Sequence, residues 1–193
     1  MKLPRTFFNR DTVQVARSLL GCTMTHVLED GTRLSGRILE TEAYLPGDQA
    51  SHGYRGRTNR NAAMFMQAGT SYVYFIYGMH FCFNVVTERE GVPAAVLIRA
   101  VQPVEGIEVM RQHRAVQQGA RIAALCNGPG KLCKAFAIDR RVNGVDLCRR
   151  ESRLFIESSH STLTEQIVAT PRIGISGDEA TKHALLRFVL SDM

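Results

Sequence analysis

The chain contains 193 residues, of which 45% are hydrophobic and 22% are charged. This balance is that of an ordinary globular protein, and the length suits a single domain. The formal net charge of +6 favours a polyanionic partner such as nucleic acid, without choosing among polyanions. No stretch approaches the roughly 18 apolar residues of a membrane span, and the start of the chain lacks a signal-peptide core, so we expect an intracellular, cytoplasmic protein without a membrane partner.

The first third of the chain predicts a helix followed by a β-hairpin. Asp11 is a residue type that caps helix N-termini, and Gly21 is expected to end the helix. Two strand-like segments, residues 22–27 and 33 to about 44, flank a turn signal at Asp30-Gly31. A loop rich in glycine and arginine over 46–61 and a short helix over 62–66 follow.

The rest of the chain predicts further strands and two helices. Aromatic and β-branched residues favour a strand over 71–77, Gly78 marks a turn, and residues 80–86 favour the returning strand. We expect a strand over 94–101, helices over 104–117 and 131–138, and short strands near 154–156, 172–175 and 185–190. Strands and helices do not alternate regularly, which predicts an α+β fold: a single domain over 1–193 with a mainly antiparallel, curved sheet, flanking helices and a protruding β-hairpin.

Two glutamates occur close together in the strand predicted over 33–44. Because alternate residues of a strand share a face, Glu40, Glu42 and Tyr44 are expected to lie on one side. Successive same-face residues are about 6.5–7 Å apart, so the two carboxylates would influence each other, as in a site for general acid or base catalysis. The alternative is an edge strand whose exposed charges oppose aggregation.

The aromatic hairpin over 71–86 has two interpretations. Tyrosines in a strand usually belong to a core or an interface. However, Tyr77 stands at the hairpin tip beside Met79, and a side chain on such a tip can wedge between base steps of DNA. Tyr44, His52 and Tyr74 could supply flat faces on which a base stacks.

Basic residues cluster in two places. Arg55, Arg57 and Arg60 lie in the glycine-containing loop, and Lys131 follows the turn-like run Asn-Gly-Pro-Gly at 127–130. Solvated surface charge and a plain turn are one interpretation. The other is contact with DNA phosphates, because glycines let the backbone approach closely and helix N-termini attract anions.

The remaining residues predict neither a metal nor an organic cofactor. The six histidines show no metal-ligand spacing, and the sequence contains neither a P-loop nor a dinucleotide-binding motif. The cysteines are odd in number and show no C-x-x-C pair, so we expect them to be reduced and mostly buried. They are Cys22, Cys82, Cys126, Cys133 and Cys148.

Several segments, in order along nearly the whole chain, carry a resemblance to a known family. They are residues 36–44, 61–66, 69–84, 97–105, 128–133 and 172–175. The most specific runs are Glu-Thr-Glu-Ala-Tyr at 40–44 and Tyr-Val-Tyr…Tyr-Gly-Met at 72–79. In these runs the chain resembles the alkyladenine DNA glycosylases, also called 3-methyladenine or N-methylpurine DNA glycosylases.

The resemblance implies a monofunctional DNA glycosylase that needs no cofactor and acts as a monomer on double-stranded DNA. Such an enzyme flips damaged purines (3-methyladenine, 7-methylguanine, hypoxanthine or ethenoadenine) out of the duplex. Water then hydrolyses the N-glycosidic bond, which starts base excision repair. The alternative is a non-catalytic nucleic-acid-binding module, for which a carboxylate facing a phosphate-lined groove brings no advantage.

The resemblance also implies residue roles. Glu42 would activate the water as general base, with Arg99 nearby to help place it. Tyr44, His52 and Tyr74 would form the pocket for the flipped base.

Further roles follow from the same resemblance. Asn84 would stand at the pocket floor, where it clashes with the 2-amino group of guanine, and main-chain groups around Ala43 and His52 would read the purine edge. Tyr77, with Met79 beside it, would fill the gap in the duplex. The chain departs from vertebrate members in a loop between Tyr44 and His52 that is one residue shorter, and in His80, which replaces a tyrosine and bears on substrate preference.

Overall fold

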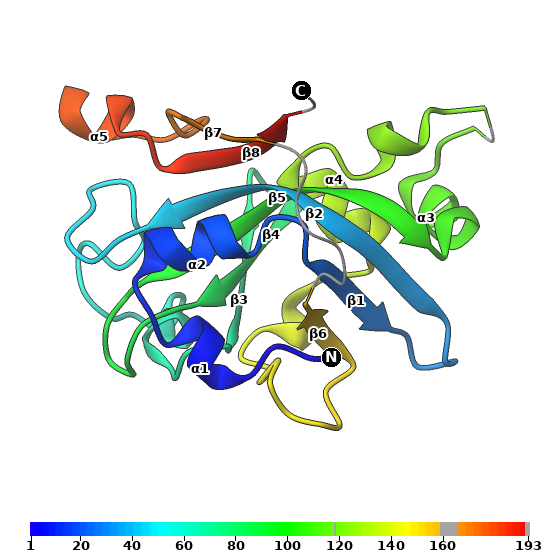
Figure 1. Ribbon diagram of the computed structural model, residues 1–193, viewed down its shortest axis with the longest axis horizontal. Helices are drawn as coiled ribbons and strands as arrows, with labels where there is room; N and C mark the ends of the chain where they lie inside the picture. The colour runs from blue at the N-terminus through cyan, green and yellow to red at the C-terminus, as the bar shows by residue number, and fades with distance from the viewer. Residues whose placement is uncertain (118, 159–165, 192–193) are drawn as a thin grey trace.

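A computed structural model describes residues 1–117, 119–158 and 166–191, and a curled antiparallel sheet is its main feature (Figure 1). The strands are β1 (Thr23–Val27), β2 (Arg33–Tyr44), β3 (Ser71–Ile76), β4 (His80–Val86), β5 (Ala95–Glu105), β6 (Leu154–Glu157), β7 (Gln166–Thr170) and β8 (Arg187–Ser191). The α-helices are α1 (Arg5–Phe8), α2 (Thr12–Ser18), α3 (Ile107–Arg114), α4 (Pro129–Ala135) and α5 (Glu179–His183). Short 3₁₀ helices occur at Ala62–Phe65, Ile122–Leu125 and Arg140–Val142.

Strand β2 is the centre of the sheet. Among the described residues, the strand order is β3-β4-β5-β2-β1-β6, and β8 pairs with both β2 and β7. One edge of β2 pairs with β5, while the other pairs with β1 over Arg33–Arg37 and with β8 over Glu40–Glu42. The register to β5 shifts on both sides of Glu40, and such bulges bend a strand. Both glutamates therefore lie inside the sheet, in the part of β2 that pairs with β8 instead of β1.

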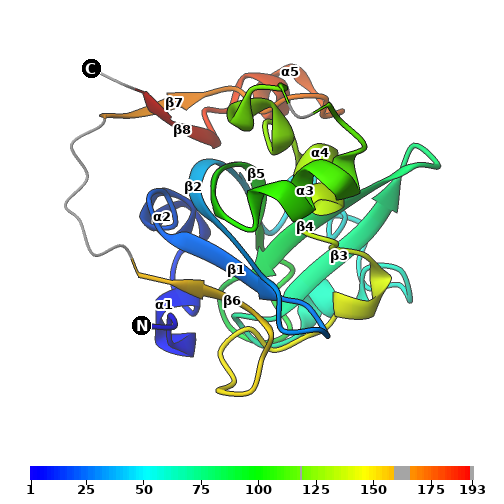
Figure 2. The same cartoon turned by 90° about the vertical axis from the view of Figure 1, so that its right-hand side faces the viewer.

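Helices cover the sheet and close its core. Helix α2 packs against β2, and α4 packs against β4 and β5; Figure 2 shows the two helices on opposite sides of β2 and β5. The predicted cap is present, because the Asp11 side chain accepts a hydrogen bond from the Gln14 amide. Phe83 and Phe136 are fully buried in the main core, whereas a smaller cluster around Tyr72 lies beneath the site described below.

The predicted protruding hairpin is formed by β3 and β4. Tyr77 and Gly78 at its tip have φ values of 54° and 67°. Two consecutive residues in the left-handed region make the kind of tight turn that matches the twist of paired strands. The tip projects beyond the body of the protein on the side of α4 (Figure 2).

The structure confirms the α+β class and corrects several predicted bounds: the helix expected over 104–117 ends at Arg114, and the helix expected over 131–138 spans Pro129–Ala135. The helix expected from residue 104 begins at Ile107, because β5 continues to Glu105, which pairs with Ser35 of β2. The strand expected over 172–175 is a bend instead, and the strand nearby is β7. Within the described residues, no helix has the length and apolarity needed to cross a membrane.

Candidate active site

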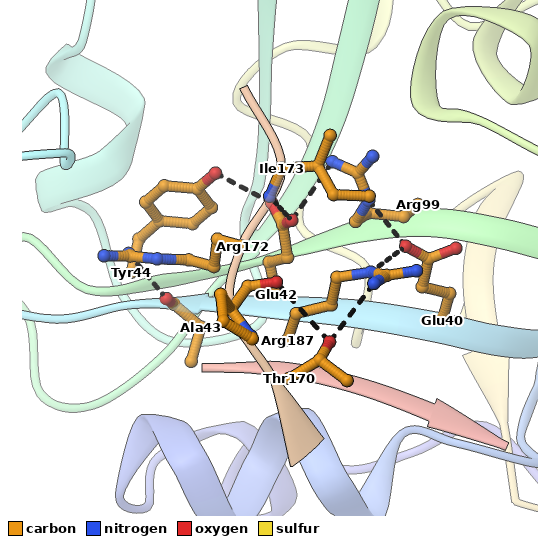
Figure 3. A network of polar contacts seen from close by, with 10 residues as sticks. Glu40, Glu42, Ala43, Tyr44, Arg99, Thr170, Arg172, Ile173 and Arg187 are labelled. Carbon is orange, nitrogen blue, oxygen red and sulfur yellow. Dashed lines mark hydrogen bonds and ion pairs between the residues drawn. The ribbon is translucent and has the colours of Figure 1, made fainter. Parts of the chain in front are cut away.

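The Glu42 carboxylate is buried at the centre of a polar network (Figure 3). Glu42 has 0% exposed surface. Its Oε2 accepts a hydrogen bond of 2.8 Å from the Tyr44 hydroxyl, and its Oε1 accepts one of 2.9 Å from the Ile173 amide. The same Oε1 lies 3.2 Å from Nη1 of Arg99. A buried charge requires partners of this kind, and here they come from three segments of the chain.

Arg99 on β5 joins Glu42 to Glu40. Its Nε donates a hydrogen bond of 2.8 Å to Oε1 of Glu40, which also accepts one of 2.6 Å from Nε of Arg187 on β8. The contacts confirm that Glu40, Glu42 and Tyr44 share one face of β2 (Figure 3). The edge-strand alternative is wrong, because β2 pairs with neighbours along both edges.

The network stabilises the protonated forms of Arg99 and Tyr44. Burial opposes the charge of Arg99, but the Glu42 and Glu40 carboxylates outweigh this effect and raise the pKa of Arg99. Burial and the adjacent Glu42 charge raise the pKa of Tyr44. Arg99 is therefore a fixed cation, and the Tyr44 hydroxyl keeps its proton and donates it to Glu42 in a hydrogen bond.

Two cavities share the side chains of Tyr44 and Tyr74. The smaller has a volume of about 250 Å³ and the larger about 450 Å³. The smaller is further lined by Gln49, Ala50, Ser51, His52, Met64, Tyr72, Ile76, Asn84, Gly174, Ile175 and Ser176. The larger reaches the hairpin tip and the start of α4, and its lining includes Arg99 and Lys131. A further cavity of about 560 Å³ around His26 includes none of the Glu42 network.

Aromatic rings form one wall of the smaller cavity. The His52 and Tyr74 rings meet edge to face with centroids 4.4 Å apart, and Tyr72 and Tyr74 are 5.4 Å apart. Nδ1 of His52 lies 2.7 Å from the Tyr72 hydroxyl. The His52 residue is exposed overall, but one side of its ring packs against Tyr72 and Tyr74. This partial burial and the nearby Arg60 cation lower the pKa of His52. The structure thus brings Tyr44, His52 and Tyr74 together as uncharged rings at neutral pH.

Asn84 and Ala43 differ in their relation to this cavity. Asn84 lines it, and its Nδ2 donates a hydrogen bond of 3.0 Å to the Tyr72 carbonyl. Ala43 does not line it. The Ala43 amide donates to the Leu186 carbonyl, and its own carbonyl accepts from Arg172. Ala50 and Ser51 of the loop that follows β2 do line the cavity.

The hairpin tip carries exposed apolar surface. Tyr77 is 75% exposed and Met79 is 70% exposed. The larger cavity begins beside the tip, since Tyr77 and His80 line it. The tip side chains are therefore available to a partner that approaches both cavities.

The basic residues have different environments. Arg55 and Arg57 are exposed, while Nη2 of Arg60 donates a hydrogen bond of 3.1 Å to the Phe75 carbonyl. Lys131 lines the larger cavity and donates a hydrogen bond of 2.9 Å to Asn127. Gly53 in the loop is explained by packing, because a Cβ atom there would collide with Pro93.

Sequence analysis gave no role in the site to Tyr72 of the aromatic wall. It also missed Asp48, Arg172, Ile173 and Arg187. Segment 172–175 is one of the segments that carry the family resemblance. Because the sequence predicts a strand there, its amides are expected to pair with a neighbouring strand and not with Glu42. In the structure, the Ile173 amide donates its hydrogen bond to the Glu42 side chain and not to a strand. Within the described residues, no group of three or more His, Cys, Asp or Glu side chains could hold a metal ion. The five cysteines, all of them among the described residues, form no disulfide bond, and Cys148 is the one that is not fully buried.

Comparison with known proteins identifies the family. The family model described as methylpurine-DNA glycosylase matches residues 6–193. A protein of Desulfitobacterium hafniense is 48% identical over 99% of this chain and 96% of its own length. A protein of Methanocella arvoryzae is 46% identical over 93% of this chain and 88% of its own. Both carry the provisional name 3-methyladenine DNA glycosylase. The chain therefore belongs to the methylpurine-DNA glycosylase family, whose enzymes are hydrolases acting on N-glycosyl bonds.

Proposed function

We propose that this enzyme rotates a damaged purine out of duplex DNA into the smaller cavity and cuts its bond to the sugar. The observation that carries the proposal is the buried Glu42 carboxylate, held by Tyr44 and Arg99 behind an aromatic-lined cavity. The cavity volume of about 250 Å³ is below the range of roughly 300–1,000 Å³ for drug-sized ligands, which suits a ligand no larger than one base. An enzyme acting on a base must first take it out of the stack.

Glu42 acts as general base in the chemical step. A water oxygen attacks the sugar C1′ while its proton passes to the Glu42 carboxylate. The C1′–N bond breaks, and its electron pair leaves with the base, so the products are a free base and an abasic site. 3-Methyladenine and 7-methylguanine are positively charged and become neutral on leaving. Hypoxanthine and ethenoadenine require a proton from the enzyme or from solvent.

Tyr44 and Ile173 cover the Glu42 carboxylate. The hydroxyl of Tyr44 occupies Oε2, the Ile173 amide occupies Oε1, and the carboxylate has no exposed surface. The attacking water therefore reaches Oε2 only when the Tyr44 hydroxyl shifts as the base enters beside its ring. Contacts in free enzymes commonly rearrange in this way on forming the productive complex.

Tyr77, Met79 and the basic residues hold the DNA. Tyr77 fills the gap left by the base and offsets part of the unstacking cost of a few kcal/mol. Arg55, Arg57, Arg60 and Lys131 contact phosphates. The enzyme works as a monomer on cytoplasmic DNA, and a non-catalytic DNA-binding module would have no use for the buried Glu42 network.

The test uses duplexes that each carry one defined lesion: 3-methyladenine, 7-methylguanine, hypoxanthine or ethenoadenine. We expect strand breaks only after alkali treatment, and no covalent adduct with borohydride, because water and not a lysine amine attacks the sugar. The matched control is the undamaged duplex. Equal breakage of damaged and undamaged DNA, or none in either, would contradict the proposal.

A further inference from the structure

A buried ion pair next to the smaller cavity has no part in the proton transfer. The side chains of Arg172 and Asp48 are 1% and 7% exposed. Both Nη atoms of Arg172 donate to the Asp48 carboxylate, and the Nη2 contact with Oδ1 is 3.0 Å long. Paired hydrogen bonds of this kind hold both side chains in one geometry. A buried pair is costly to desolvate and is weak evidence for a purely stabilising role.

The guanidinium of Arg172 also holds strand β2. Its Nη1 donates a hydrogen bond of 3.0 Å to the Ala43 carbonyl. Its central carbon lies 4.8 Å from the centre of the Tyr44 ring, the distance of a cation–π contact. Arg172 therefore holds the Tyr44 ring, which lines both cavities; Figure 3 shows the guanidinium beside this ring.

The pair joins two loops that form one wall of the smaller cavity. Asp48 belongs to the segment whose residues Gln49–His52 line the cavity, and Arg172 precedes the segment Gly174–Ser176 on the same cavity. The next residue, Ile173, donates its amide to Glu42. A second contact between the loops, Gln49 with Asp178, lies at the surface. The guanidinium of Arg172 thus contacts the cavity wall and the Tyr44 ring, and it lies one residue from the amide that donates to Glu42.

We propose that Arg172, held by Asp48, is the positioning residue that sets the base cavity and Glu42 into register with each other. This inference rests on the proposed function. A misplacement of about 1 Å in a catalytic site costs up to roughly 100-fold in rate. Loss of the pair should therefore slow excision even where the fold and the rest of the DNA contact surface are intact.

The experiment compares two variants with a matched control. Arg172→Lys keeps the charge but loses the planar fork. Asp48→Asn/Arg172→Met removes both charges and keeps similar volume, so it avoids an unpaired buried charge. The control is Arg5→Lys, because Arg5 also donates to an aspartate, Asp146, and to a main-chain carbonyl, away from the site. For each we measure single-turnover release of hypoxanthine, affinity for a duplex with a non-cleavable abasic analogue, and the thermal unfolding midpoint.

The proposal expects both variants to lose about 10- to 100-fold in excision rate, with affinity for the abasic duplex unchanged and unfolding midpoints close to that of Arg5→Lys. Wild-type excision rates in both variants would overturn it. So would a joint fall of rate, affinity and unfolding midpoint, since that is the signature of a structural role. Absence of excision by the wild-type enzyme would reject the proposed function and this inference with it.

Discussion

Glu40 and Glu42 share the guanidinium of Arg99, which lies 2.8 Å from Oε1 of Glu40 and 3.2 Å from Oε1 of Glu42. The two carboxylates are nevertheless unequal. Glu40 is neutralised by a second cation, Arg187, whereas Glu42 turns its other oxygen to Tyr44 at the cavity wall. This asymmetry supports the proposal that Glu42 accepts the proton of the attacking water, while Glu40 holds Arg99 in place.

Glu42→Gln is expected to abolish excision while leaving DNA binding intact. Glutamine keeps the shape of the side chain, but it cannot accept the proton of water. Loss of a general base typically costs about 10²–10⁴-fold in rate. The measurement is single-turnover release of hypoxanthine, combined with gel-shift affinity for an abasic-analogue duplex. A rate near that of the wild type would mean that Glu42 does not activate the water.

Glu40→Gln is the internal comparison for that variant. It removes the charge that holds Arg99 and Arg187 but leaves the proton acceptor, so we expect a loss well below that of Glu42→Gln. The same two assays apply. If Glu40→Gln is the more damaged variant, the roles of the two carboxylates are reversed.

Tyr77→Ala should impair excision more than folding. The side chain is 75% exposed, so its removal should change stability by about 1 kcal/mol or less. As a wedge, Tyr77 matters most where the base is well stacked, so the rate should fall more for a lesion in a matched duplex than in single-stranded DNA. Equal losses on the two substrates would remove the wedge assignment.

Asn84→Ser should admit unmodified guanine to the cavity. Guanine differs from hypoxanthine by its 2-amino group, and a smaller side chain at the cavity floor leaves room for it. The variant also loses the hydrogen bond to Tyr72, worth about 1 kcal/mol, so its unfolding must be measured alongside. The assay compares release of guanine from G·T duplexes by the two proteins. No gain by a folded variant would show that Asn84 does not contact the purine edge.

DNA binding should weaken steeply with salt. Each phosphate neutralised by Arg or Lys adds about −0.9 to the slope of log K against log salt concentration. Replacing the exposed Arg55 and Arg57 by Gln should therefore make the slope shallower by about 1.8. Arg141→Gln, an exposed arginine paired with Asp139, is the control and should leave the slope unchanged. Identical slopes for all three proteins would exclude the loop from the contact surface.

Stability should fall on mild acidification because of two histidines. Burial is the main cause that lowers the pKa of both His26 and His52 below the ordinary value of 6.5. Below that pH the unfolded chain binds protons before the folded protein does, so the free energy of unfolding decreases toward the lower folded pKa values. Above it, these groups contribute no pH dependence. Thermal unfolding between about pH 7.5 and 5.5 should shift less in His26→Gln/His52→Gln than in the wild type; equal shifts would contradict this account.

Local sequence patterns determined much of this protein. Alternation predicted the face shared by Glu40, Glu42 and Tyr44, and Gly78 predicted the hairpin turn. The family resemblance named Tyr44, His52, Tyr74 and Asn84, which line the smaller cavity, but not Tyr72 of its aromatic wall, and it named Ala43, which does not line the cavity. These features depend on residues a few positions apart in the chain, or on short family motifs that the sequence itself displays.

The tertiary structure decided what depends on distant partners. Strand β5 continues to Glu105 because Glu105 pairs with Ser35 of β2. The local sequence pattern instead predicted a helix from residue 104. The segment after Pro171 is a bend because Arg172 forms an ion pair with Asp48 and the Ile173 amide donates a hydrogen bond to Glu42. Such pairings decide the backbone path because a buried charge or amide without a hydrogen-bond partner is costly. The partner can lie far away in the sequence, so no local pattern predicts it.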